Sequence, residues 1–172
     1  MREAAQCWRP GGIVTKRSDL IVVLRHAYAG VKLDDPSDDF MRGLDDTGRA
    51  SAGAMAHVLP EHVVPVELVS SPYFRCTETV QPLSERLELP IRTRAELRPA
   101  ATREEVMGLL LAANDRTLVC THGEVIIRVF DGLTCEKGAA WILRRRAGML
   151  EPVQYVYPRG SPLAVAVGGL TA

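Results

Sequence analysis

Two histidines and two arginines of this chain stand at or just beyond the ends of apolar runs. Arg25 and His26 close one such run, Arg75 comes shortly after a second, and His122 follows a third. A guanidinium group grips an oxyanion through its planar fork of N–H donors, and an imidazole can act as a nucleophile. The sequence therefore predicts an anion site that also contains a candidate nucleophile, provided that the fold brings the four side chains together.

The apolar runs themselves are expected to be buried strands. Residues 20–24, 66–70 and 117–121 are rich in β-branched and aliphatic side chains, which is typical of strands covered on both faces. Open α/β sheets bind ligands beyond the carboxyl ends of such strands. Because all four polar side chains come at these ends, we expect them to share one cleft.

Helices alternate with these strands along the chain. The spacing of apolar residues predicts helices over residues 46–59, 73–87, 103–113 and 123–130, with a kink or weak turn at Pro82. Further short strands are expected at residues 91–94, 139–144 and 154–157, the last two as an antiparallel pair. Alternating strands and helices indicate an α/β fold with a mostly parallel sheet.

The remaining segments are expected to be less regular. Residues 1–19 carry basic side chains without the apolar core of a signal peptide, and we expect a flexible leader there. Residues 20–172 show no internal boundary and are expected to form one domain. Residues 32–43 are rich in aspartate and proline, and we expect a mobile, solvated loop rather than a magnesium site.

Composition excludes several classes of function. The 172 residues include 21 basic and 21 acidic ones, so the basic excess of a nucleic-acid-binding protein is missing. No run of about 20 apolar residues is present, and we expect no membrane-spanning helix. The four cysteines lack metal-ligand spacing, so no metal site is expected. Free thiols suit a reducing cytoplasm, which is the expected location.

Four motifs resemble those of one known family. Residues 24–27 (Leu-Arg-His-Ala) resemble the Arg-His-Gly motif of the histidine phosphatase superfamily, which has the phosphoglycerate-mutase-like fold. Residues 70–79 are similar to its Ser-Ser-Pro-x-x-Arg-x-x-x-Thr element, and residues 121–123 to its Ser/Thr-His-Gly motif. Residues 44–49 resemble the Leu-Thr-x-x-Gly segment that opens its first helix. All four come in the order of the family.

The resemblance implies a fold, an activity and a set of partners. The fold is a three-layer α/β/α sandwich with an antiparallel C-terminal edge, and the activity is metal-independent hydrolysis through a phosphohistidine on His26, with no cofactor. Within the superfamily the chain looks most similar to SixA-type phosphohistidine phosphatases and to the phosphatase-like half fused to Nudix hydrolases. The expected partner is a phosphorylated small molecule or a phosphohistidine protein. A non-catalytic phosphate-binding module and a phosphotransferase or mutase stay open as alternatives, and so does the oligomeric state.

The resemblance also assigns roles to the candidate residues. His26 is the nucleophile, Arg25 and Arg75 hold the phosphoryl oxygens, and His122, if protonated, adds another cationic donor. We expect His26 to be neutral, with its second ring nitrogen donating to a main-chain carbonyl. The main-chain N–H groups of Gly123 and Glu124 begin a helix and are expected to complete the anion site.

The chain departs from the family pattern at two places. Ala27 replaces the usual glycine, and its methyl group is a possible obstacle to phosphate. The glutamate that protonates the leaving oxygen in many members has no counterpart, because residues 97–98 (Leu-Arg) are followed by Pro99. Glu104 and Glu105 are expected on the next helix. A missing acid favours N–P or P–O–P substrates, whose leaving groups need a proton less than an alkoxide does.

Overall fold

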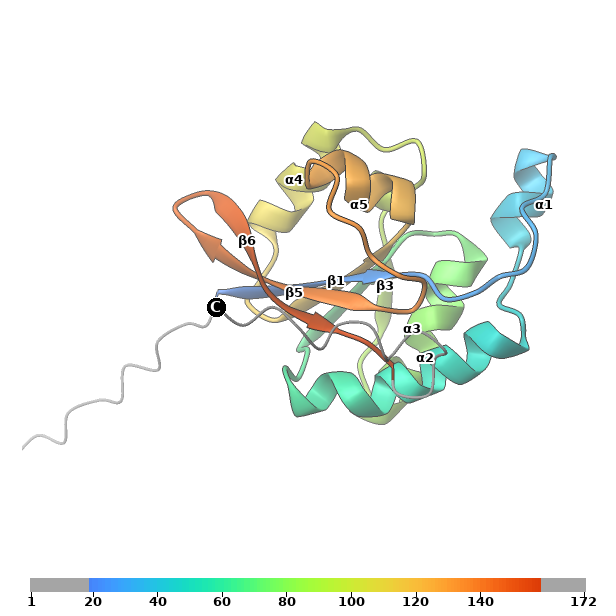
Figure 1. Ribbon diagram of the computed structural model, residues 1–172, viewed down its shortest axis with the longest axis horizontal. Coiled ribbons are helices and arrows are strands. Elements are labelled where there is room, and N and C mark those ends of the chain that lie inside the picture. The colour runs from blue at the N-terminus through green and yellow to red at the C-terminus, as the bar shows by residue number, and fades with distance from the viewer. Residues whose placement is uncertain (1–18, 159–172) are drawn as a thin grey trace, which may run out of the picture.

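A six-stranded mixed sheet lies at the centre of the fold in the computed structural model, which describes residues 19–158 (Figure 1). The strands are β1 (Leu20–Arg25), β2 (Glu67–Ser70), β3 (Ile91–Thr93), β4 (Thr117–Thr121), β5 (Ala140–Arg146) and β6 (Met149–Val156). Their order in the sheet is β3-β2-β4-β1-β5-β6. Strands β1 to β4 pair in parallel, and the β5–β6 hairpin adds an antiparallel edge beside β1. The predicted sheet is confirmed.

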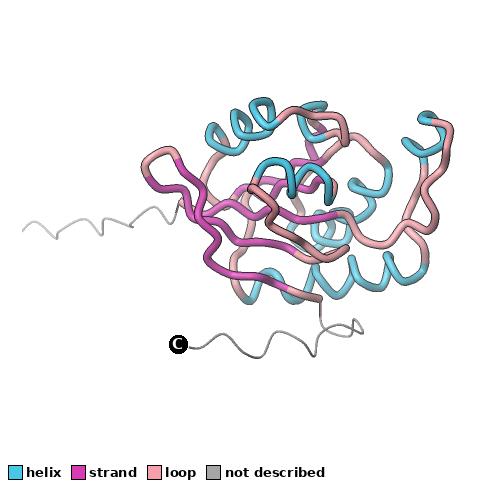
Figure 2. The backbone as a smooth tube through the Cα atoms, turned by 45° about the horizontal axis from the view of Figure 1, so that its top comes forward, coloured by secondary structure: helices cyan, strands magenta, loops and turns pink. Residues whose placement is uncertain are grey.

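Helices cover both faces of this sheet (Figures 1 and 2). They are α1 (Pro36–Met41), α2 (Asp46–Val58), α3 (Phe74–Leu87), α4 (Arg103–Ala112) and α5 (Gly123–Val129), with short 3₁₀ turns at Leu59–Glu61 and Ala95–Leu97. In the view of Figure 1, α4 and α5 lie above the sheet and α2 and α3 below it. The three-layer α/β/α arrangement is therefore confirmed, and α3 is one continuous helix in spite of Pro82.

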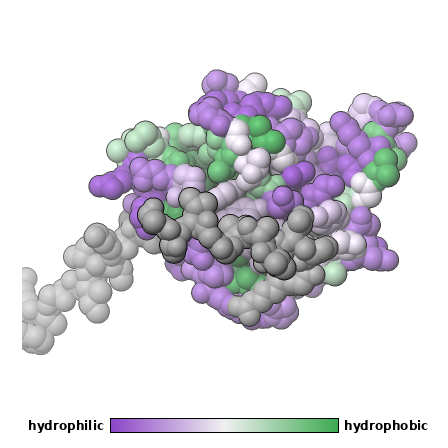
Figure 3. All heavy atoms as spheres, in the orientation of Figure 1, coloured by the Kyte–Doolittle hydropathy of each residue, from purple (hydrophilic) through white to green (hydrophobic). Residues whose placement is uncertain are grey.

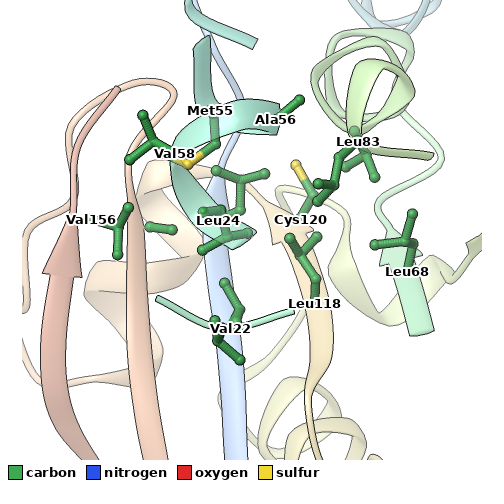
Figure 4. Packing of buried hydrophobic residues seen from close by; sticks show 14 of the residues in the cluster. Val22, Leu24, Met55, Ala56, Val58, Leu68, Leu83, Leu118, Cys120 and Val156 are labelled. Atoms are coloured by element: carbon green, nitrogen blue, oxygen red, sulfur yellow. The ribbon is translucent and has the colours of Figure 1, made fainter. Parts of the chain in front are cut away.

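The core divides into two layers because side chains alternate along each strand. On β1, Val22 and Leu24 point to the layer of α2 and α3, where Met55, Val58 and Leu83 surround them (Figure 4). Ile21 and Val23 point to the opposite layer, against α4 and α5. Burying each such side chain stabilises the fold by about 1.5–3 kcal/mol, so β1 is held firmly from both faces.

The segment expected to be a mobile loop contains a short helix instead. The carboxylate of Asp35 caps α1 by accepting hydrogen bonds from Ser37 N (2.8 Å) and Asp38 N (3.3 Å). One turn further on, Asp39 is only 6% exposed. The prediction of a solvated acidic loop is thus wrong at α1, because pairing with Arg42 and Arg75, described below, compensates the burial of the Asp39 carboxylate.

Polar residues cover most of the face seen in Figure 3, and the exposed apolar side chains on it are scattered. Within residues 19–158, no helix combines the length and the apolar character needed to cross a membrane. The leader predicted for residues 1–19 falls almost entirely outside the described residues, as do residues 159–172 of the predicted domain. Both assignments remain predictions.

Candidate active site

The parallel pairing of β1 with β4 brings the two histidines together. Arg25 lies opposite Thr121 in the register, so His26 and His122 leave the sheet at the same edge. The N–H of His26 donates to the carbonyl of Thr121 (3.0 Å), which ties the two strand ends. The imidazole ring centroids are 5.2 Å apart in an edge-on arrangement. The two histidines therefore meet just beyond the carboxyl ends of these strands.

His26 is held in the protonation state that a nucleophile needs. Its Nδ1 lies 2.8 Å from the carbonyl oxygen of Ala27, and because a carbonyl only accepts, Nδ1 carries the proton. Nε2 therefore keeps its lone pair. Burial, assisted by the charges of Arg75 and Arg25, lowers the pKa of His26 from 6.5 to about 3, so the ring is neutral near pH 7.

His122 is neutral as well, which differs from the protonated form considered from the sequence. Its Nδ1 lies 3.3 Å from Nη2 of Arg75, and a guanidinium only donates, so Nδ1 accepts. Nε2 then carries the proton and donates to Oγ of Ser71 (2.9 Å). Burial, with added repulsion from His26 and Arg75, lowers the pKa of His122 to about 2. These surroundings make His122 a partner of Arg75 rather than a cation.

A buried carboxylate that sequence reasoning missed positions Arg75. The Nη1 group of Arg75 donates to the main-chain carbonyl of Asp39 (2.8 Å) and lies 3.3 Å from its Oδ2. Asp39 also accepts from Nε of Arg42 (2.8 Å). Burial acts to raise the pKa of Asp39, but the Arg42 hydrogen bond and the Arg75 charge hold it below its usual value. Nothing in the sequence separates Asp39 from the other aspartates of its loop.

Arg25 packs against the start of α5. Its Nη1 donates to the carbonyl of Cys135 (2.8 Å), and a Cβ placed on Gly123 would lie 2.6 Å from its Cζ. Only glycine at position 123 leaves room for this guanidinium. Nε of Arg25 and Nε of Arg75 are buried without a hydrogen-bond partner among the described residues. Unsatisfied buried donors cost free energy, so the other contacts of each guanidinium must offset this burial.

Two hydroxyl groups of the 70–79 motif join its arginine to the histidine motifs. Oγ1 of Thr79 donates to the carbonyl of Arg75 (2.6 Å) and accepts from the N–H of Ala27 (2.9 Å). Oγ of Ser71 receives the hydrogen bond from His122. The sequence placed both residues in a motif, but their roles depend on contacts across more than 45 positions of the chain.

One cavity of about 400 Å³ joins three of the four predicted catalytic side chains. Arg25, His26 and Arg75 line it, together with the predicted binding residue Glu124. His122 lies behind Arg75 and does not line the cavity, and Gly123 lies behind Arg25. The expectation that all four catalytic candidates share one cleft thus holds for Arg25, His26 and Arg75 but not for His122. Anion binding by the N–H groups of Gly123 and Glu124 stays a prediction.

The two departures from the family pattern have different consequences here. The methyl group of Ala27 is fully buried in an apolar cluster with Ala29, Leu44 and Ala52 and is absent from the cavity wall. Substitution of glycine by alanine therefore leaves the phosphate approach open.

The wall of the cavity has no carboxylic acid at the position after the Leu-Arg pair, where Pro99 lies instead. Glu104 and Glu105 line a different groove, of about 760 Å³, between β3 and α4. Glu105 is further engaged in a capping box with Thr102. Neither glutamate is positioned to protonate a leaving group at His26. Among the described residues, no three His, Cys, Asp or Glu side chains gather as a metal site requires.

Known proteins share this sequence pattern and this fold. Residues 21–104 match the family model of the histidine phosphatase superfamily (branch 1). In an alignment of 160 residues that covers 80% of this chain, the sequence is 29% identical to an 8-oxo-(d)GTP phosphatase of Mycolicibacterium smegmatis, and the match covers 48% of that protein. The chain therefore spans about half the length of this curated relative.

Two solved structures show the same fold. The SixA protein of Agrobacterium tumefaciens, a candidate phosphohistidine phosphatase, has a TM-score of 0.68 at 20% identity, covering 82% of this chain and 99% of its own. The protein histidine phosphatase SixA complexed with tungstate has a TM-score of 0.67 at 23% identity, covering 81% and 97%. At these identities the likeness establishes a common architecture.

Proposed function

We propose that this chain is a phosphatase of the histidine phosphatase superfamily, whose branch 1 model matches residues 21–104, and that it forms a covalent phosphohistidine on His26. The observation that carries the proposal is the hydrogen bond from Nδ1 of His26 to the carbonyl of Ala27. It leaves an unprotonated Nε2 in a cavity that Arg25 and Arg75 also line. A nucleophile with its lone pair free and two cationic clamps beside it are the parts that phosphoryl transfer requires.

The first step transfers the phosphoryl group to His26. Nε2 attacks phosphorus in line, and the bond to the leaving group breaks with its electron pair going to the leaving atom. The ring then carries Nδ1–H and Nε2–P and gains positive charge, which the Ala27 carbonyl stabilises. Arg25 and Arg75 bind the equatorial oxygens, where charge is spread in the transition state.

The second step returns the enzyme to its starting state. Water attacks the phosphohistidine, the N–P bond breaks, and Nε2 recovers its electron pair while the water proton leaves with phosphate or solvent. His122 stays neutral through both steps: its Nδ1 accepts from Arg75 and so holds that guanidinium in place beside the phosphoryl group.

The substrate is proposed to have a leaving group that departs without a proton donor. A phosphohistidine and a phosphoanhydride both meet this condition, because their leaving groups are weaker bases than an alkoxide. The position occupied by Pro99 supports this restriction. The names of the similar proteins include both kinds of substrate, a protein histidine phosphatase and an 8-oxo-(d)GTP phosphatase.

The covalent step is tested by comparing wild type with His26→Ala, using His57→Ala at an exposed histidine as the matched control. Wild type and His57→Ala should turn over a phosphohistidine peptide or ADP and, after rapid quenching, carry an acid-labile, base-stable phosphoryl adduct. His26→Ala should lose the adduct and about 10³-fold or more in kcat. Full turnover in His26→Ala would end the proposal. Tight phosphate binding without turnover by wild type would favour the non-catalytic binding module.

A further inference from the structure

The cavity around His26 is larger than a single phosphoryl group requires. Its wall contains two lysines in addition to the arginines that are proposed to bind that group. A volume of about 400 Å³ is within the range of sites for small organic ligands. Besides Arg25 and Arg75, the wall contains Lys32 from the β1–α1 loop and Lys137 from the α5–β5 loop. Neither lysine is needed to hold a phosphoryl group that the arginines already bind.

Lys137 is fixed relative to the nucleophile by its neighbour in the chain. The N–H of Gly138 donates to the carbonyls of Arg25 (3.1 Å) and His26 (3.2 Å). Gly138 has a φ of +78°, a conformation that L side chains rarely adopt, so this close contact depends on glycine. The Nζ atom of Lys137 lies 5.0 Å from the ring centroid of Tyr28. Lys137 therefore directly precedes the residue that is hydrogen-bonded to Arg25 and His26 at the end of β1.

The charges of both lysines are available to a ligand. Neither Lys32 nor Lys137 forms an ion pair in the described part of the chain. The wall has three acidic residues against five cationic ones: Asp39 is occupied by Arg42 and Arg75, and neither Asp34 nor Glu124 forms an ion pair with either lysine. Because the cationic side chains of the wall outnumber the acidic ones, two ammonium groups without ion pairs attract a second anionic group of the same molecule.

Extending the proposed function, on which this inference rests, we propose that Lys32 and Lys137 form a second anion subsite that binds the leaving phosphate of a phosphoanhydride substrate. Nε2 of His26 attacks the terminal phosphorus, the P–O bond to the bridging oxygen breaks, and its electron pair stays on the phosphate held by the lysines. The ammonium groups stabilise the charge that develops there. This arrangement performs the task of the glutamate that Pro99 replaces, because a phosphate bound to two cations leaves without protonation.

The subsite is tested by substrate preference. Wild type, Lys32→Ala, Lys137→Ala and the double variant are assayed with ADP and with p-nitrophenyl phosphate, whose leaving group carries no phosphate. Arg94→Ala is the matched control, because Arg94 is an exposed cation in the groove between β3 and α4. Loss of one charge-assisted contact should lower the ratio of kcat/KM for ADP over p-nitrophenyl phosphate about tenfold, and the double variant should lower it further. Arg94→Ala should keep the wild-type ratio.

Calorimetry separates a failure of the subsite from a failure of the proposed function. Pyrophosphate should bind wild type at least about tenfold more tightly than orthophosphate, and the double lysine variant should lose this difference. An unchanged substrate ratio, or equal binding of the two anions by wild type, would overturn the subsite. If wild type prefers pyrophosphate but hydrolyses no phosphorylated compound, the subsite stands as a binding site and the phosphatase proposal fails.

Discussion

Acid is expected to destabilise this protein mainly through its two buried histidines. An imidazole in the unfolded chain has a pKa of 6.5, and in the fold the pKa is about 3 for His26 and about 2 for His122. A group whose pKa is lowered by folding contributes stability above its unfolded pKa and loses it as the pH falls. From pH 6.5 downwards the unfolded chain therefore takes up protons that the native protein excludes.

The magnitude follows from the width of this pH window. Between pH 6.5 and pH 5.0, each histidine lowers the free energy of unfolding by about 1.4 kcal/mol per pH unit, or about 2 kcal/mol. His26 and His122 together amount to about 4 kcal/mol, against a total of about 5–15 kcal/mol for a typical domain. The corresponding fall in Tm is about 8–16 °C for a chain of this size. Most carboxylates are still ionised at pH 5.0, so the two imidazoles dominate this window.

Urea unfolding at pH 7.5 and pH 5.0, in buffers without phosphate or sulfate, measures this effect. His26→Gln and His122→Gln should each remove about 2 kcal/mol of the difference between the two pH values. His57→Gln, at an exposed histidine, should retain the whole difference. The reasoning would be refuted by a pH dependence that is the same in wild type and in both buried-site variants, whatever their stability at pH 7.5.

Glycine-to-alanine substitutions test the close contacts near the site. In each pair, one glycine has atoms close to the added Cβ and the other has open space. Gly123→Ala should lower kcat/KM about 10- to 100-fold by displacing Arg25, whereas Gly108→Ala, with open space around its Cβ, should leave it unchanged. On α2, Gly48→Ala should destabilise by about 2–3 kcal/mol, because its Cβ would lie 1.9 Å from a main-chain carbonyl oxygen of the β1–α1 loop. Gly53→Ala, five residues further along that helix and with no neighbour within 4 Å, should stabilise by about 0.5–1 kcal/mol. Steady-state kinetics and urea unfolding measure these effects, and equal effects within either pair would contradict the assigned contacts.

The sequence by itself determined the strands, most of the helices and the edge of the sheet where the site lies. Continuous apolar runs mark strands buried on both faces, and parallel strands present their carboxyl ends at one edge. His26 and His122 could therefore be placed together without coordinates. The sequence also predicted two helix N-caps, because the side chains of Thr102 and Asp45 each accept a hydrogen bond from the main-chain N–H three residues further on.

Only the tertiary structure decided which groups surround these histidines and what protonation state they hold. The burial of Asp39, the hydrogen bond between Ser71 and His122, and the approach of Lys137 to the site all join segments far apart in the chain. From the sequence, Asp39 is expected to be solvated like the other aspartates of its loop. It is buried because the fold brings Arg42 and Arg75 against its carboxylate. Desolvation sets the pKa of both imidazoles, and desolvation is a property of the packed surroundings rather than of the residue.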